Sequence, residues 1–108
     1  MAPPEDKKLT LIVRVESGCL GPKGADVVDD FCRQACKAFE SLYPEFIVRQ
    51  IESRDDMALP KKDYYIGHKL LDNIKATKYL ALFGQNLTEI EMVLEDKLVA
   101  HINDYLGY

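Results

Sequence analysis

Residues 9–24 are LTLIVRVESGCLGPKG, a strand pattern followed directly by a glycine-rich loop. The strand pattern has a period of two, and its first face consists of Leu9, Leu11, Val13 and Val15. Ile12 makes the second face partly apolar as well. Because β-branched residues dominate this run and both faces carry apolar surface, we expect a central strand over residues 9–16.

A helix and a second strand follow the loop. Residues 25–43 repeat apolar side chains at helical spacing, and aspartates in the first turns suit the amide end of a helix dipole. Pro44 is expected to end this helix. Residues 46–53 again have a strand-like pattern. A strand, a helix and a strand in this order predict a right-handed crossover that joins two parallel strands.

The next segment predicts a hairpin. Residues 54–62 are polar and contain Pro60, so we expect a connection without regular structure. Residues 64–71 place tyrosines, isoleucine and leucines around Gly67. This pattern predicts two short antiparallel strands that turn at or near the glycine.

A helix is expected after the hairpin. Asp72 or Asn73 can cap a helix over residues 74–83, and Gly84 stands where a left-handed C-terminal cap is expected. The alternative is a strand over residues 78–83, because that run is almost continuously apolar. The cap signals at both ends favour the helix.

The last helix has the clearest pattern. Thr88 and Glu91 have the spacing of a capping box, and Leu87 and Met92 have that of a hydrophobic staple. The apolar face of this helix consists of Ile90, Leu94, Leu98, Ile102 and either Tyr105 or Leu106. The sequence thus predicts a single α/β domain over residues 9–108 after a flexible tail over residues 1–8. The expected element order is β-α-β-β-β-α-α, with the helices packed on the sheet.

Length and composition restrict the functional classes. The chain has 108 residues, of which 47% are hydrophobic and 30% charged, as is typical of one folded domain. A net charge of −4, with scattered Lys and Arg, argues against a nucleic-acid partner. No segment is apolar and long enough for a membrane span or a secretory signal. Three cysteines do not form a secreted disulfide framework, so we expect a cytoplasmic protein with free thiols and no cofactor.

Cys19 is the first candidate catalytic residue. It lies between the first strand and the first helix, where the amide dipoles of a helix start favour a thiolate. The alternative is a small loop residue that packs under the helix start. Cys32 and Cys36 are four residues apart on the helix, so we expect them in or near the core. Because His68 and His101 lie in unrelated elements, the sequence predicts no metal site.

Lys23 and Gly24 are candidates for an anion site. Gly18, Gly21 and Gly24 recur every three residues just before the helix. The pattern lacks both the close glycine pair of the dinucleotide motif and the Lys-Ser/Thr pair of the phosphate loop. A helix start can still attract an anion. A structural turn is the favoured interpretation.

His68 is a candidate proton carrier in the hairpin. Asp63 across the hairpin could orient its imidazole, provided that the fold brings His68 to Cys19. The alternative is that His68 is a polar turn residue.

The order of strand, cysteine-bearing loop, helix, parallel strand, proline, hairpin and helix resembles the thioredoxin and glutaredoxin architecture. The segments that carry the resemblance are SGCLGP at 17–22, LP at 59–60 and YYIGHKL at 64–70. The resemblance implies that Cys19 is a nucleophilic thiol and that Pro60 shapes a substrate groove. Pro22 stands where the family has its resolving cysteine, which excludes dithiol exchange within this loop. Residues 54–59 are also too few for the helix that the family has before its proline.

Three functions are open on these observations. The first is a non-catalytic cytoplasmic binding protein whose partner is another protein or a second copy of the chain, because no complete catalytic set is present. Tyr64, Tyr65 and Tyr79 would support it if they form an exposed aromatic patch. The second is a single-thiol redox protein that uses Cys19. The third is an anion- or nucleotide-binding module at the turn over residues 21–24.

Overall fold

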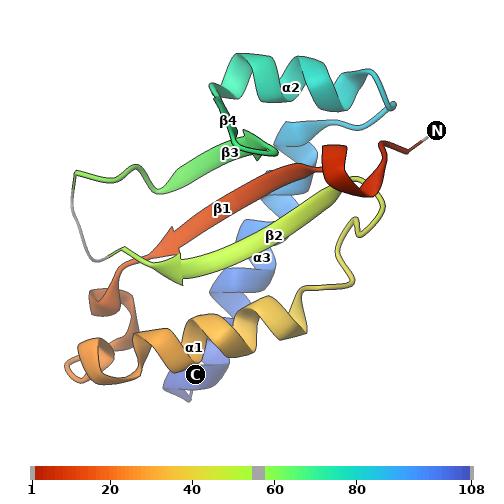
Figure 1. Ribbon diagram of the computed structural model, residues 1–108. Coiled ribbons are helices and arrows are strands. Elements are labelled where there is room, and N and C mark those ends of the chain that lie inside the picture. Colours follow the sequence, from red (N-terminus) through yellow and green to blue (C-terminus); the bar gives the residue numbers. More distant parts are fainter. Residues whose placement is uncertain (1, 55–57, 108) are drawn as a thin grey trace.

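A four-stranded mixed sheet forms the centre of the computed structural model, which describes residues 2–54 and 58–107 (Figure 1). The strands of the described residues are β1 (Leu9–Val15), β2 (Ile47–Ser53), β3 (Lys62–Ile66) and β4 (Lys69–Leu71). Their α-helices are α1 (Gly24–Ala38), α2 (Asn73–Ala81) and α3 (Leu87–Leu106). Short 3-10 helices span Glu5–Lys7 and Ser17–Leu20. The expected single α/β domain and its element order are confirmed.

The strand order in the sheet is β2-β1-β3-β4. β1 pairs in parallel with β2, from Leu9 opposite Ile47 to Val15 opposite Ser53. β3 runs antiparallel to β1, with Ile66 opposite Leu9, and β4 completes the hairpin. The predicted central strand, parallel crossover and hairpin are therefore all present.

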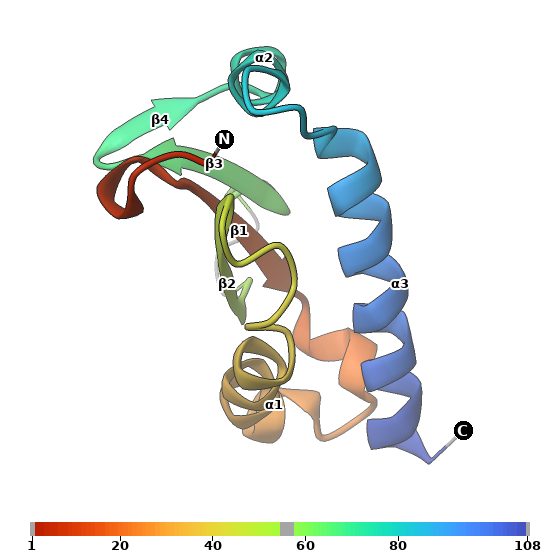
Figure 2. The same cartoon turned by 90° about the vertical axis from the view of Figure 1, so that its right-hand side faces the viewer.

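One face of the sheet carries the hydrophobic core. The alternate residues of β1 from Leu9 to Val15 are all buried on this face, where α3 runs along the sheet, to its right in Figure 2, and α1 packs against β2. The largest fully buried side chains are Phe31, Leu9, Leu11, Ile47, Leu80, Leu87 and Ile90. Burial of one such side chain contributes about 2 kcal/mol, so this layer supplies most of the stability.

The opposite face of the sheet has no helix on it among the described residues, as Figures 1 and 2 show from two directions. The register places Thr10, Ile12 and Arg14 of β1 on this face. We call it the open face. The domain thus has two layers, with helices on one side of the sheet.

The first helix ends earlier than expected. α1 ends at Ala38, and turns connect it to β2. Pro44 lies within these turns and is therefore not the residue that ends the helix. Arg49 of β2 donates to the carbonyl oxygens of Glu40 and Leu42, the latter at 2.7 Å. These carbonyls would accept backbone bonds in a longer helix, so the arginine stabilises the non-helical turn instead.

The structure decides between helix and strand after the hairpin. Asp72 caps α2, and its carboxylate accepts a hydrogen bond from the Lys75 amide at 2.7 Å. Gly84 has a positive φ of +73° a few residues after the helix ends. The helix is confirmed, and the alternative strand over residues 78–83 is wrong.

The start of α3 differs from the predicted capping box. The N-cap is Asn86, whose side-chain oxygen accepts from the Glu89 amide at 3.1 Å. Thr88 lies within the first turn, and Met92 is 60% exposed, so it forms no staple with buried Leu87. Two capping patterns overlap here in sequence, and the one that starts at Asn86 brings Leu87 into the core.

The N-terminal segment, expected to be a flexible tail, contains the short 3-10 helix over residues 5–7. Lys8 donates to the Pro44 carbonyl at 2.6 Å, and the hydroxyl of Tyr79 donates to the Lys7 carbonyl at 2.5 Å. These contacts attach the segment to the start of β1 and to α2. Among the described residues, no helix combines the length and apolarity that crossing a membrane requires.

Candidate functional site

Cys19 lies at the carboxyl end of β1, in the 3-10 helix Ser17–Leu20, and its side chain is exposed. It lines a shallow depression of about 130 Å³ that also includes basic and acidic side chains. The other lining residues are Arg14, Val15, Glu16, Lys61, Leu98 and Ile102. The expected placement between strand and helix is correct, and the thiol is accessible from solvent.

The glycines before α1 serve the fold of the loop itself. Gly21 has a φ of +88°, which a residue with a side chain rarely adopts. Gly24 is buried, and a Cβ atom there would overlap the carbonyl oxygen of Ser17. The close approach that these glycines permit is therefore one of backbone to backbone.

Lys23 and Gly24, the candidate anion site, lie at the start of α1. Lys23 is exposed at the N-cap position. The amide of Gly24 donates to the Gly21 carbonyl at 3.0 Å, and that of Asp26 donates to the Lys23 carbonyl at 3.1 Å. Two amides of the helix start already have partners in the backbone, and the acidic Asp26 beside them disfavours an anion.

Pro60 lies near the same end of the sheet as Cys19. Its neighbour Lys61 lines the depression with Cys19, and its own carbonyl oxygen accepts from Arg14 at 2.9 Å. The peptide bonds of the described residues, including Leu59–Pro60, are all trans. The cysteine and the proline on which the family resemblance rests thus lie at the same end of the sheet, and Pro60 itself does not line the depression. The groove-shaping role of Pro60 stays a prediction.

His68 does not lie near Cys19. It follows β3 in the hairpin turn, and the end of β3, Ile66, pairs with Leu9 at the start of β1. Cys19 comes after Val15 at the other end of this strand, which is about 20 Å long. The expected Cys19–His68 arrangement is therefore not formed, and the role of His68 as a proton carrier has no support from this geometry.

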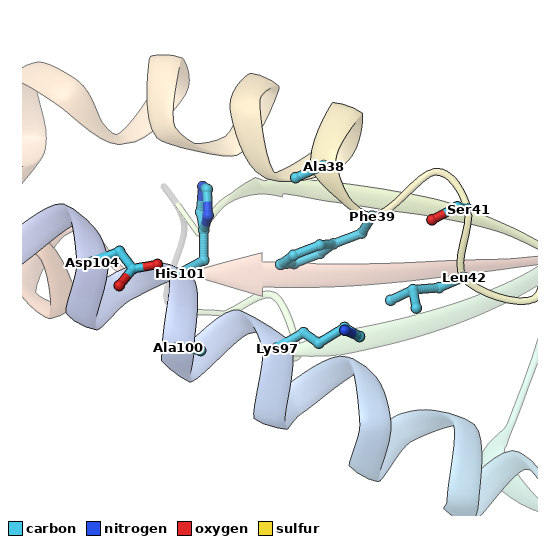
Figure 3. A pocket seen from close by; sticks show the side chains of 8 residues that line it. All are labelled: Ala38, Phe39, Ser41, Leu42, Lys97, Ala100, His101 and Asp104. Atoms are coloured by element: carbon cyan, nitrogen blue, oxygen red, sulfur yellow. The ribbon is translucent and has the colours of Figure 1, made fainter.

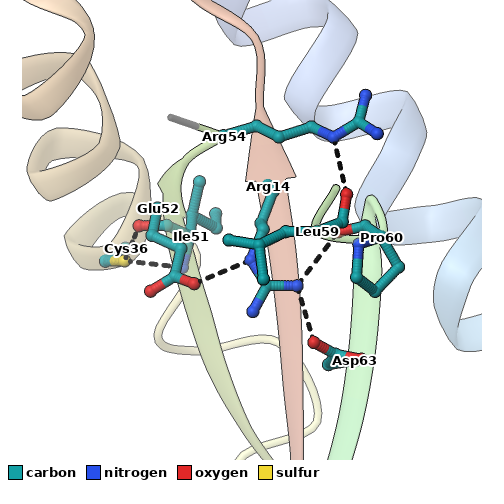
Figure 4. A network of polar contacts seen from close by, with 8 residues as sticks. All are labelled: Arg14, Cys36, Ile51, Glu52, Arg54, Leu59, Pro60 and Asp63. Carbon is teal, nitrogen blue, oxygen red and sulfur yellow. Dashed lines mark hydrogen bonds and ion pairs between the residues drawn. The ribbon is translucent and has the colours of Figure 1, made fainter. Parts of the chain in front are cut away.

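Asp63, which was expected to orient His68, instead belongs to a cluster around Arg14 on the open face (Figure 4). Arg14 donates to the carboxylate of Asp63 at 2.7 Å and to that of Glu52 at 3.0 Å. Its side chain is only 7% exposed. Burial alone would lower the pKa of Arg14, but the hydrogen bonds and charges of Asp63 and Glu52 outweigh it and raise the pKa. The arginine joins the three strands β2, β1 and β3.

A second arginine joins loops at this end of the sheet. Arg54 forms an ion pair with Glu16 at 2.6 Å and donates to the carbonyl of Leu59 at 2.9 Å. Its own amide donates to the Val15 carbonyl. These contacts hold the segments that flank Cys19. The sequence alone does not identify the ion pair, because Glu16 and Arg54 are 38 residues apart in the chain.

The open face carries an apolar row that crosses all four strands. The register aligns Leu70 of β4, Tyr65 of β3, Thr10 of β1 and Val48 of β2. Leu70 is 57% exposed and Val48 is 38% exposed, while Tyr65 and Thr10 are partly exposed. Beneath this row, Ile12 is 9% exposed. We call these five residues the open-face row.

Of the three tyrosines that could form an exposed patch, the structure places only Tyr65 on the open face. Tyr64 is buried on the helix side, where its hydroxyl donates to Glu91 at 3.2 Å and accepts from Asn73 at 3.0 Å. Burial raises the pKa of Tyr64, and the charge of Glu91 adds to this effect. Tyr79 packs edge-on against Phe83. The expected patch of three tyrosines is not formed.

Lys62 and Tyr64 share Glu91 as a partner. Lys62 pairs with Glu91 at 2.7 Å and with Glu95 of α3. Burial would lower the pKa of Lys62, but its bonds to the two glutamates outweigh this and raise the pKa. Glu91 thus connects α3 with β3, which is the role it has in place of a helix cap.

A further hollow of about 260 Å³ lies between the end of α1 and α3 (Figure 3). His101 contacts two phenylalanine rings. Its ring centroid lies 5.7 Å from that of Phe39 and 5.1 Å from that of Phe31. Lys97 and Asp104 lie at its rim. This aromatic contact gives His101 a packing role between two helices.

Comparisons with known proteins give no further guidance: no family model, no curated protein and no solved structure matches the chain. In residues 2–54 and 58–107, no group of three or more His, Cys, Asp or Glu side chains is arranged to hold a metal ion. A function therefore has to be inferred from the surfaces described above.

Proposed function

We propose that this protein is a non-catalytic binding protein of the cytoplasm that acts as a homodimer through its open face. The observation that carries the proposal is the open-face row, in which exposed Leu70 and Val48 lie at the two sides of a sheet without a second helical layer. A sheet normally buries its apolar face against another layer. A second sheet can supply that layer by packing face to face.

The charges of the open face support a second copy as the occupant. Arg14 pairs with Glu52 and Asp63 on the same face, so one positive charge offsets one of the two negative charges within each chain. Two chains of net charge −4 can therefore approach here with little local repulsion. A twofold interface uses the same patch on both partners, and homodimer interfaces are more apolar than other protein surfaces.

The size of the face sets the expected affinity. The strands are at most seven residues long, and β4 has three. A face of this size lies at the lower end of specific interfaces, so we expect a reversible dimer with a dissociation constant of about 10–100 µM.

Sedimentation equilibrium over a concentration series tests the proposal. We expect the mass to rise from that of one chain, 12.3 kDa, toward that of two as the concentration increases. Added salt should leave the association constant nearly unchanged, because apolar contacts dominate the interface. A single-chain mass at every concentration up to about 1 mM would rule out the homodimer.

A second candidate is a single-thiol redox protein that uses Cys19. What favours it is that Cys19 is the exposed member of the three thiols and lines a depression of about 130 Å³. Alkylation of the native protein over a pH series, with each cysteine assigned by mass spectrometry, tests this candidate. Selective reaction of Cys19 below the pH of an ordinary thiol supports it, and ordinary titration of Cys19 excludes it.

A further inference from the structure

Two thiols that the proposed function does not use share a groove between α1 and β2. Cys32 and Cys36 lie one helical turn apart, and both line this groove, whose volume is about 450 Å³. The other lining residues are Asp29, Arg33, Ile51, Glu52 and Ser53. On a helix, side chains four residues apart have Cβ atoms about 5–6 Å apart. The two sulfur atoms can therefore reach one small ligand.

Backbone groups of β2 hold the sulfur of Cys36 in place (Figure 4). The amide of Ile51 donates to Cys36 Sγ at 3.1 Å, and the thiol donates to the Ile51 carbonyl at 3.3 Å. These two hydrogen bonds to one residue fix the position of the sulfur. The sulfur of Cys36 thus has a fixed position beside the groove.

The charges around the groove nearly cancel once the pairing of Glu52 with Arg14 is counted. Asp29 and Glu52 contribute two negative charges and Arg33 one positive charge. Glu52 also pairs with Arg14 at 3.0 Å on the far side of β2. None of these charged groups is a sulfur ligand, so the selectivity of the site has to come from the two thiols. Thiolate sulfur is a soft ligand that selects soft ions such as Cu⁺.

We propose that Cys32 and Cys36 bind one Cu⁺ ion as a pair of thiolate ligands. Cu⁺ is stable with two sulfur ligands, so the site needs no third side chain. On binding, both thiols release their protons to solvent, two Cu–S bonds form, and no electron is transferred. Cys36 gives up its hydrogen bond to the Ile51 carbonyl and keeps the one from the Ile51 amide.

Competition for Cu⁺ with a chromophoric chelator, under anaerobic reducing conditions without added thiol, tests the site. We expect the wild-type chain to hold one Cu⁺. Cys32→Ser and Cys36→Ser should each weaken binding by about 100-fold or more, because the second sulfur of a chelate acts at high effective concentration. Cys19→Ser is the matched control and should leave the affinity unchanged. Serine at position 36 retains a hydroxyl for the Ile51 backbone groups, so the contact between α1 and β2 is kept.

The reverse result overturns the proposal. If Cys19→Ser abolishes binding, or if the other two variants hold Cu⁺ as tightly as the wild type, the pair is not the site. If either variant fails to fold, the wild type alone decides the question by alkylation with one equivalent of Cu⁺ present. Protection of Cys36 while Cys19 still reacts supports the proposal. Reaction of Cys36 at its metal-free rate contradicts it.

Discussion

At the scale of single residues, Gly24 shows how one position determines the loop that carries Cys19. Its missing side chain lets the Ser17 carbonyl approach the start of α1, where any Cβ atom would overlap that oxygen. Gly24→Ala should therefore lower the free energy of unfolding by about 1–3 kcal/mol, as overpacking of a tight site does. Urea denaturation measures the change.

The matched control for this prediction is Gly18→Ala, because a Cβ atom at Gly18 meets nothing within 4 Å. We expect a change below about 0.5 kcal/mol there. Equal effects of the two substitutions, or a more stable Gly24→Ala protein, would mean that the loop does not have this conformation.

Tyr64 gives a prediction about pH. Burial and the charge of Glu91 raise its pKa, so the folded protein holds the hydroxyl proton more tightly than the unfolded chain does. The contribution of Tyr64 to stability is then complete below the unfolded pKa of about 10 and declines as the pH rises through the higher folded pKa. We expect Tyr64→Phe to cost about 1 kcal/mol at neutral pH, through its hydrogen bonds to Glu91 and Asn73.

The measurement is the difference in unfolding free energy between the wild type and Tyr64→Phe from about pH 9 to about pH 11. The difference should shrink as the pH rises, because only the wild type loses the contribution. Tyr65→Phe is the control, because Tyr65 is only partly buried and lies on the other face of the sheet. A difference that stays constant or grows would contradict the assignment.

The position of a single residue was predicted correctly where the residues next to it in the sequence determine its surroundings. The place of Cys19 between strand and helix follows from the elements on either side of it. The partners of Asp63 and Glu91 do not, because Arg14 is 49 residues from Asp63 and Lys62 is 29 residues from Glu91. Such contacts depend on the register of the sheet, which a local pattern does not contain.

At the scale of elements, the N-terminal cap of α3 distinguishes the observed cap at Asn86 from the capping box predicted at Thr88. Asn86→Ala removes the side-chain oxygen that accepts from the Glu89 amide and should cost about 1 kcal/mol. Thr88→Ala is the control and should change the unfolding free energy by less than about 0.5 kcal/mol, because Thr88 lies on the exposed side of the first turn. Thermal denaturation of the two variants compares them. A larger loss for Thr88→Ala would restore the capping box predicted from sequence.

Periodicity explains which elements the sequence could predict. The alternation in β1 and the helical stripe in α1 are strong signals. A second strand pattern follows the helix, and the order of strand, helix and strand predicts the parallel crossover. Helix ends are weaker signals, because several polar residues can cap. At the end of α1, Arg49 of the next strand stabilises the turn, and this contact cannot be read from the helix sequence itself.

At the scale of the whole molecule, the one-sided sheet is the feature with the largest consequence. The even-numbered residues of β1 include Ile12 and Arg14, a mixed pattern that fits either a second helical layer or a face that binds a partner. Only the assembled sheet aligns Leu70 and Val48, which are 22 residues apart, into one row. The sequence predicts a non-catalytic binding function, but the surface proposed for it appears only when the sheet is assembled.

The central test of the proposed homodimer compares Leu70→Lys with Met92→Lys. Leu70 is 57% exposed on the open face, and Met92 is 60% exposed on α3, so both substitutions place a charge on equally accessible surface. We predict that the wild type and Met92→Lys form dimers at high concentration in sedimentation equilibrium, whereas Leu70→Lys stays a single folded chain. A wild type that never dimerises, or a dimer that is lost with Met92→Lys and kept with Leu70→Lys, would contradict the proposed role of the open face.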